Sequence, residues 1–116
     1  MPFLSEKDNA ILENISEAIN KIIEISKPYT SLEKFQDNFI HFDAVLMNFI
    51  VIGEMVSKLS EEFKENNEQI EWRKINAFRN ILAHNYFGID DKAVWQIIQD
   101  DIPKLKKSLR EIFNSD

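Results

Sequence analysis

Apolar residues recur at intervals of three and four along most of the chain, which is the period of one face of an α-helix. The first such stretch follows Ser5, which with Asp8 resembles a helix-capping box, and it continues until Pro28. We therefore predict a first helix between residues 5 and 28. Its apolar stripe consists of Ile11, Leu12, Ile15, Ala18, Ile19, Ile22 and Ile23.

A second start signal, Thr30 with Glu33, precedes the longest apolar stretch of the chain. Helical spacing continues from there as far as Leu59, which is longer than a typical globular helix. The pattern predicts one long helix that forms the spine of a bundle or a subunit interface. Its apolar positions are Phe35, Phe39, Phe42, Leu46, Phe49, Ile50, Gly53, Val56 and Leu59.

Polar side chains gather between residues 60 and 69, and they predict a frayed helix end followed by a connection. A third helix is expected to begin near Trp72 and to end between Asn85 and Gly88, and Asp90 or Asp91 would cap a fourth. The apolar stripes of these two helices contain Ile75, Phe78, Leu82, Val94, Ile97 and Ile98.

Pro103 interrupts the last part of the chain and leaves two interpretations open. It either lies in the first turn of a new helical segment that Asp101 begins, or it kinks a continuous helix. In total, four or five antiparallel helices with short connections predict an all-α, up-and-down bundle. Its final stripe consists of Leu105, Leu109, Ile112 and Phe113.

The composition agrees with a helical fold and limits the chemistry. The length of 116 residues fits a single domain over residues 1–116, and 2 Gly and 3 Pro are too few for a β-sandwich. The lack of cysteine excludes disulfides, thiolate zinc sites and thiol nucleophiles. No apolar run approaches the ~20 residues that span a bilayer, and the N-terminus lacks signal-peptide features. We expect a cytoplasmic protein without a membrane partner.

The aromatic residues suggest a second buried surface on the long helix. Nine Phe and two Trp exceed what the seam of one narrow bundle accommodates. Phe39, Phe42 and Phe49 extend the apolar surface of this helix beyond one stripe. Either the helix is central, or it packs against another subunit, and we expect a homodimer.

Charge is unevenly distributed along the chain. The net charge is −6, which argues at first sight against a nucleic-acid partner. However, residues 1–69 carry a net −7 and residues 70–116 a net +1, and the second part holds all three arginines. Because the planar fork of arginine suits phosphate, any phosphodiester would be bound by the C-terminal part. Ordinary charged helix surfaces would produce the same asymmetry.

The segment from residue 78 to residue 88 combines Arg79, Asn80, His84 and Tyr86. At ~100° per residue, Asn80 and His84 share one helix face, while Arg79 and Tyr86 share a neighbouring one. Asn80 and His84 lie on the side opposite the core stripe of this helix, which contains Ile75, Phe78 and Leu82. His84 is therefore either a solvent-exposed residue or part of a cleft that a dimer mate completes.

Other kinds of catalytic centre find little support. Neither His41 nor His84 has the Glu-x-x-His spacing of a helical metal site, and Gly53 and Gly88 form no phosphate-binding loop. His41 is expected to be a partly buried polar residue. We therefore expect no metal and no cofactor. The serines interpreted as helix caps rather than nucleophiles are Ser5, Ser31 and Ser60.

Gly53 is unusual because glycine inside a helix costs ~1 kcal/mol relative to alanine. Its presence suggests the close approach of another helix or of a ligand, with Glu54 beside it. Close helix packing alone explains this glycine equally well.

The pattern R-N-x-x-x-H-x-Y, formed by Arg79, Asn80, His84 and Tyr86, resembles the signature of the HEPN superfamily, specifically its HepT-type toxins from toxin–antitoxin pairs. The similarity extends along nearly the whole chain, through Trp72 and the residues that follow the motif. It departs from the family pattern at Glu71, where proline is frequent, and at Asn85, where glycine is frequent. Other matching segments are Ile52-Gly53-Glu54, Phe87-Gly88-Ile89-Asp90, Val94-Trp95 and Asp101-Ile102-Pro103.

The resemblance implies an all-helical homodimer that cleaves RNA without a metal, with two motifs facing each other across a cleft. Arg79 would clamp the phosphate, and His84 would act as general acid or base. Asn80 would orient His84 or bind a non-bridging oxygen, and Glu54 is a candidate supporting residue. The resemblance also implies that a cognate nucleotidyltransferase antitoxin transfers AMP to Tyr86, which would repel RNA.

Two other functions remain open from the sequence. The chain would be a catalytically silent helical module that docks a separate nucleotidyltransferase, or a structural dimer whose motif builds only its interface. A nucleotidyltransferase in the neighbouring reading frame would favour the ribonuclease toxin and the docking module over the structural dimer.

Overall fold

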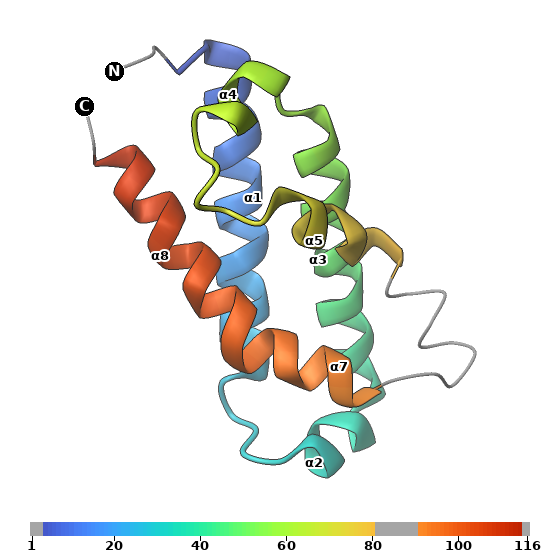
Figure 1. The fold of residues 1–116 in the computed structure, drawn as a ribbon. Helices are drawn as coiled ribbons and strands as arrows, with labels where there is room; N and C mark the ends of the chain where they lie inside the picture. The colour runs from blue at the N-terminus through green and yellow to red at the C-terminus, as the bar shows by residue number, and fades with distance from the viewer. Residues whose placement is uncertain (1–3, 81–90, 115–116) are drawn as a thin grey trace.

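The computed structural model describes residues 4–80 and 91–114, and every regular element within these ranges is helical. Helices α1 (Glu6–Ser26) and α3 (Phe39–Lys58) run side by side in opposite directions, and α8 (Ile102–Phe113) crosses them obliquely (Figure 1). The predicted all-α bundle is confirmed. The shorter elements are α2 (Leu32–Asp37), α4 (Glu61–Glu65), α5 (Trp72–Asn76), the 3₁₀ helix η1 (Ala77–Asn80), α7 (Asp91–Gln96) and the π-helical turn η2 (Ile97–Asp101).

The three predicted serine caps are confirmed. The hydroxyl oxygens of Ser5, Ser31 and Ser60 each accept a hydrogen bond from the backbone N–H three residues later, at 3.0, 3.3 and 3.1 Å. These bonds satisfy N–H groups that have no partner inside the first helical turn. They begin α1, α2 and α4.

The prediction of one long second helix is wrong, because the chain leaves helical geometry at Asn38. This residue has φ −97° and ψ 86°, and its side chain accepts the N–H of His41 at 3.1 Å, which caps α3. The apolar spacing nevertheless continues across the break. Phe35 before it and Phe42 after it pack together, with ring centroids 5.2 Å apart, so periodicity alone does not reveal the interruption.

The segment predicted as a connection contains the short helix α4 and is held to α1 by Asp8. The buried Asp8 carboxylate accepts hydrogen bonds from the Ser60 backbone N–H at 3.0 Å and from the Ser60 hydroxyl at 2.6 Å. Burial by itself would raise the pKa of Asp8, but hydrogen bonds with Ser60 and Ser5 outweigh burial and hold this pKa below its ordinary value. Asp8 therefore remains ionised and ties the start of α1 to the start of α4.

The helix around Pro103 is continuous, which agrees with the second interpretation, a continuous helix distorted at the proline, and not with a new segment that begins at Asp101. η2 and α8 follow α7 without a gap, and the N–H of Ile102 donates to the carbonyl of Ile97, five residues earlier. Proline lacks an N–H, and its ring crowds the carbonyl four residues before it. The wider π-helical turn lies at the position where a regular α-helix would meet this crowding.

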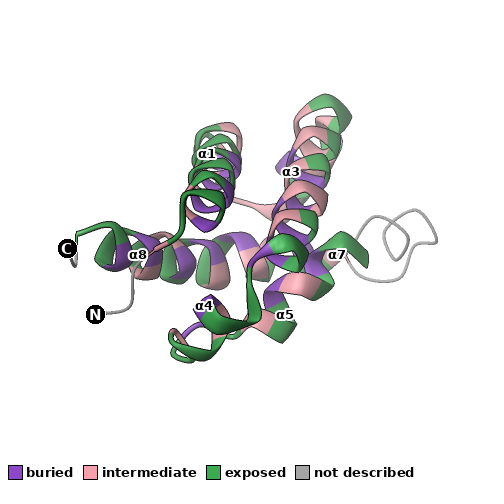
Figure 2. Ribbon diagram, turned by 90° about the horizontal axis from the view of Figure 1, so that it is seen from above, coloured by how far each residue is buried: buried purple, intermediate pink, exposed green. Residues whose placement is uncertain are grey.

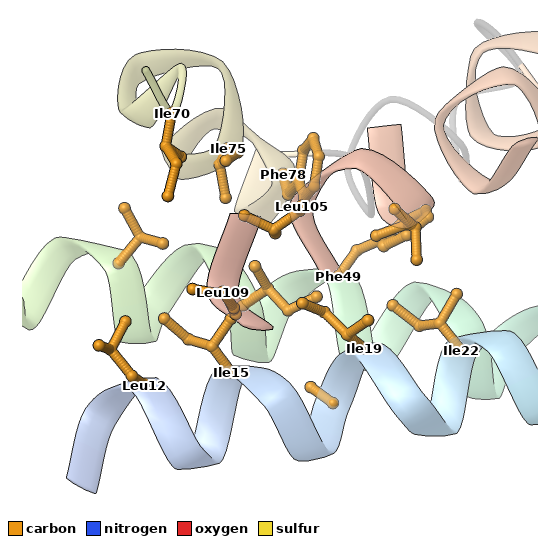
Figure 3. Close-up of a cluster of buried hydrophobic side chains, with 14 of the residues drawn as sticks. Leu12, Ile15, Ile19, Ile22, Phe49, Ile70, Ile75, Phe78, Leu105 and Leu109 are labelled. Atoms are coloured by element: carbon orange, nitrogen blue, oxygen red, sulfur yellow. The ribbon is translucent and has the colours of Figure 1, made fainter. Parts of the chain in front are cut away.

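The core lies where α1, α3 and α8 face one another, and the buried faces of these helices point inward (Figure 2). Phe49 of α3 lies at the centre of this core, between the isoleucines of α1 and the leucines of α8 (Figure 3). Phe78 of η1 closes the core, with its ring centroid 5.5 Å from that of Phe49. The side chains of α1 and α8 labelled in Figure 3 are Leu12, Ile15, Ile19, Ile22, Leu105 and Leu109.

Helix α3 carries a second apolar face that the described part of the chain leaves uncovered. Phe39, Ile40 and Met47 are 69%, 66% and 57% exposed, whereas Phe49 is buried and Phe42 half-buried. The prediction that apolar residues on this helix extend beyond one stripe is confirmed. The homodimer remains a prediction.

Length and composition would also allow α3 to cross a membrane. Among the helices of the described ranges it alone meets these criteria, with a mean hydropathy of 1.7 and 33% of the apolar window buried. A core helix of a soluble protein passes the same test, so the criteria alone assign no membrane role. The expectation of no membrane partner stays a prediction.

Candidate functional site

The segment that carries Arg79 begins at Trp72, whose side chain fixes the start of α5. The indole N–H donates to the carbonyl oxygens of Lys64 at 3.2 Å and Asn67 at 3.1 Å. The ring also packs on Phe63, with centroids 5.8 Å apart. Within the described part of the chain no side chain caps α5, and the contacts of Trp72 instead anchor the start of this helix to the end of α4.

Two ion pairs join the segment around α5 to the end of η2 and the start of α8. The ammonium of Lys74 lies 3.0 Å from Oδ1 of Asp101, and Lys104 lies 3.6 Å from Glu71. The hydrogen bond and the negative charge of Asp101 raise the pKa of Lys74. These pairs connect residues that are distant in sequence, and no local signal predicts them.

Gly53 is the position where η1 approaches α3. A β-carbon at Gly53 would lie 2.7 Å from the backbone nitrogen of Arg79, 2.9 Å from its Cβ and 3.0 Å from the carbonyl oxygen of Asn76. The first two distances are shorter than real β-carbons adopt, and the third is tighter than nearly all ordinary contacts. The expected close approach at Gly53 is therefore confirmed, and the group that approaches is the backbone that carries Arg79.

Arg79 and Glu54, predicted separately as site residues, form an ion pair. Nη1 of Arg79 lies 3.8 Å from Oε1 of Glu54, and the two side chains are 43% and 50% exposed. Asn80 is exposed beside Arg79, while Ile75 and Phe78 are buried, as the predicted orientation of this segment requires. The arrangement presents a half-exposed guanidinium, already in contact with a carboxylate, to the solvent.

His84 and Tyr86 lie outside the described residues, as does the predicted end of the third helix between residues 85 and 88. The described part of that helix changes from α5 to the 3₁₀ helix η1, which ends at Asn80. The roles expected for His84 and Tyr86 therefore remain predictions.

The uncovered apolar face of α3 leads to the Arg79–Glu54 pair. Ile40, Met47 and Glu54 follow one another at intervals of seven residues, so each lies within about 20° of the last around the helix. Ile40 and Met47 are among the exposed apolar residues, and Glu54 is half-exposed. A partner that covered this face would reach Arg79.

His41 is the half-buried polar residue that the sequence predicts. Its Nδ1 shares a hydrogen bond with the hydroxyl of Tyr29, and the two rings meet edge to face with centroids 5.7 Å apart. Within residues 4–80 and 91–114, no group of three or more His, Asp or Glu side chains is placed to hold a metal ion.

Comparison with known proteins identifies the family. A family described as "Ribonuclease HepT-like" matches residues 15–112. A "Putative RNase" of Methanocaldococcus jannaschii is 35% identical over 107 residues, covering 91% of this chain and 97% of the relative. A "Probable ribonuclease HepT" of Thermococcus cleftensis is 33% identical over 108 residues, covering 93% and 96%. No solved structure matches. The chain belongs to the HepT-like ribonuclease family.

Proposed function

We propose that this protein is a HepT-type toxin that cleaves RNA without a metal ion. The observation that carries the proposal is the half-exposed Arg79, which Gly53 brings against α3 and Glu54 contacts, in a chain of the HepT-like ribonuclease family. A guanidinium in this position can bind a phosphate through two parallel N–H···O hydrogen bonds, that is, in a bidentate manner. The proposal places the protein in the cytoplasm, together with its RNA substrate.

The reaction is an attack of the ribose 2′-oxygen on the adjacent phosphorus. The 2′-hydroxyl loses its proton to a base, the bond from phosphorus to the 5′-oxygen breaks, and that oxygen receives a proton from an acid. His84 serves as one of these groups, and the partner subunit's His84 as the other. Arg79 stabilises the charge on the pentacoordinate phosphorus, and Asn80 orients His84 or binds a non-bridging oxygen.

Glu54 supports Arg79 rather than contacting the substrate. A carboxylate 3.8 Å from Nη1 restricts the orientations that the guanidinium adopts before RNA binds. Exposed ion pairs contribute about 0–1 kcal/mol, so this positioning changes the rate by about fivefold at most. Glu54 is therefore a positioning residue.

The active form is a homodimer that buries the exposed face of α3. Phe39, Ile40 and Met47 would then leave solvent, and the seven-residue spacing to Glu54 would bring the Arg79 segments of both subunits to the same interface. A site that needs two histidines is complete only in this arrangement.

Adding charge to this face should separate the subunits. The double variant Ile40→Glu/Met47→Glu should elute with the mass of one 13.7 kDa chain, whereas the unmodified protein should elute with twice that mass. Light scattering after gel filtration measures both masses. The matched control Ala10→Glu/Asn20→Glu adds the same charge to exposed positions of α1 and should stay dimeric. A charged variant that remains dimeric would exclude this face as the interface.

Regulation would act through Tyr86 and a cognate nucleotidyltransferase antitoxin. Transfer of AMP from ATP to the Tyr86 hydroxyl, with release of pyrophosphate, would add phosphate charge seven residues after Arg79 in the chain. The added charge would occupy Arg79 and repel the RNA backbone. Modification would thereby stop cleavage without unfolding the dimer.

The proposal is tested with a single-stranded RNA in the presence of EDTA. We expect cleavage that leaves a 2′,3′-cyclic phosphate and a 5′-hydroxyl, identified by mass spectrometry. An RNA of the same sequence with 2′-deoxyribose at the cleaved nucleotide should resist, because it lacks the attacking oxygen. Absence of cleavage, together with tight binding to a nucleotidyltransferase, would instead identify a docking module. Cleavage that needs a divalent cation would contradict the metal-independent mechanism.

A further inference from the structure

A basic groove lies between α1 and α8, away from the Arg79–Glu54 pair. Its lining comes from the end of α1, the turn after it, η2 and α8, and α1 and α8 meet on the side of the bundle away from α5 (Figure 2). Lys27 lines it from the end of α1, and Lys106, Lys107 and Arg110 line it from α8. Within the described ranges, no aspartate or glutamate belongs to this lining.

None of these four cations has an acidic partner, as is also true of five of the ten other Lys and Arg side chains, but only in the groove do four such cations line one hollow of the described surface. Within residues 4–80 and 91–114, no carboxylate oxygen lies within 4.0 Å of any of the four, whereas Lys21, Lys64, Lys74, Arg79 and Lys104 each form an ion pair. The protein as a whole carries a net charge of −6. A concentration of unpaired positive charge in one groove is therefore a local departure from an acidic surface.

The composition of the groove suits a single-stranded nucleic acid. Tyr29 contributes an aromatic ring to the lining, while Ile23, Ile98 and Pro103 contribute apolar surface. Grooves that bind single strands combine cations for the phosphates with aromatic and apolar surface for the bases. An acidic peptide would use the cations but has no need of the aromatic ring, so RNA fits the lining better.

We propose that the groove formed by Lys27, Tyr29, Lys106, Lys107 and Arg110 is a second RNA-binding site that holds a strand outside the catalytic centre. The choice of RNA as the polyanion rests on the proposed function. Binding in the groove would add phosphate contacts to the substrate beyond those made at the site of cleavage. The catalytic centre itself would then need few cations. Affinity for RNA would then depend on α8, and the rate of the chemical step on Arg79 and His84.

The proposal is tested by binding rather than by cleavage. A fluorescent 2′-O-methyl oligonucleotide cannot undergo attack by its 2′-oxygen, so its anisotropy reports affinity whether or not the protein is a nuclease. The variant Lys107→Gln/Arg110→Gln removes two exposed cations of the groove. We expect affinity to fall by about tenfold or more near 0.1 M salt, and the slope of log K against log salt to decrease by about 1.4, for two lost phosphate contacts.

The matched control is Lys7→Gln/Lys58→Gln, which removes the same charge from exposed positions along another part of the surface. Its affinity should stay within about twofold of the unmodified protein. Equal losses in the two variants would show a general charge effect and overturn the proposal. An unchanged affinity for the oligonucleotide, with weaker binding of polyglutamate, would assign the groove to an acidic protein. If the unmodified protein bound the oligonucleotide through the groove but cleaved no RNA, only the proposed catalytic function would be contradicted.

Discussion

Replacing Arg79 with alanine is expected to lower the rate of RNA cleavage by about 10²- to 10³-fold, the usual cost of losing a donor that stabilises transition-state charge. The change removes the guanidinium that would contact the phosphate. It leaves the buried neighbours Ile75 and Phe78 in place, so the fold should persist. His84→Ala should produce a loss at least as large, because it removes the acid and base from both subunits.

The measurement is kcat on a defined RNA, with circular dichroism and gel filtration to verify helix content and dimer mass. Arg73→Ala is the matched control, because it removes an exposed arginine from α5 of the same segment. Its kcat should remain within about twofold of the unmodified protein. Glu54→Gln should reduce kcat by about fivefold or less, as expected for the loss of an exposed ion pair. Arg79→Ala with an unaltered rate would remove Arg79 from the mechanism.

A single methyl group at Gly53 should also impair cleavage strongly. Gly53→Ala would place a β-carbon 2.7 Å from the Arg79 nitrogen, and the contact involves backbone that has no rotamer in which to escape. The η1 segment would have to move, and a displacement of the order of 1 Å in a catalytic group costs about 10²-fold in rate. Stability should change less. Overpacking costs about 1–3 kcal/mol, but the better helix propensity of alanine returns ~1 kcal/mol.

This difference between rate and stability is the decisive readout. Thermal or urea unfolding gives the stability change, and single-turnover kinetics gives the rate. Ser57→Ala, one turn later on α3, changes an exposed side chain whose hydroxyl donates to the Glu54 carbonyl of the same helix, and should affect neither quantity. If Gly53→Ala cleaved RNA at the normal rate, the close approach of η1 would have no role in positioning Arg79.

The features predicted correctly from the sequence depend on short-range interactions. Serine caps act over three residues, and Ser5, Ser31 and Ser60 all form the expected bonds. The buried stripe of α1 follows directly from helical periodicity. Gly53 was identified because a glycine is costly inside a helix, although only the structure shows which backbone it accommodates.

The features missed depend on competition between local and tertiary interactions. At Asn38, a side-chain cap overrides an apolar period that continues on both sides of it, so the interruption has no hydrophobic signature. The Lys74–Asp101 pair and the basic groove join segments that meet only after packing. Lys27 in particular is an ordinary surface lysine until α8 is placed beside it.

The π-helical turn η2 holds one residue more than an α-helical turn, because its N–H groups donate five residues back rather than four. Deleting one residue within Ile97–Asp101 would therefore leave a regular α-helical turn, and α8 would keep nearly the same rotation about its axis. α8 carries core leucines and groove cations on different sides, and a deletion inside α8 itself would rotate the residues beyond it by ~100° and turn both sets away from their neighbours. Within this family, a one-residue alignment gap at η2 is therefore compatible with the same inward and outward positions, whereas a gap inside α8 is not.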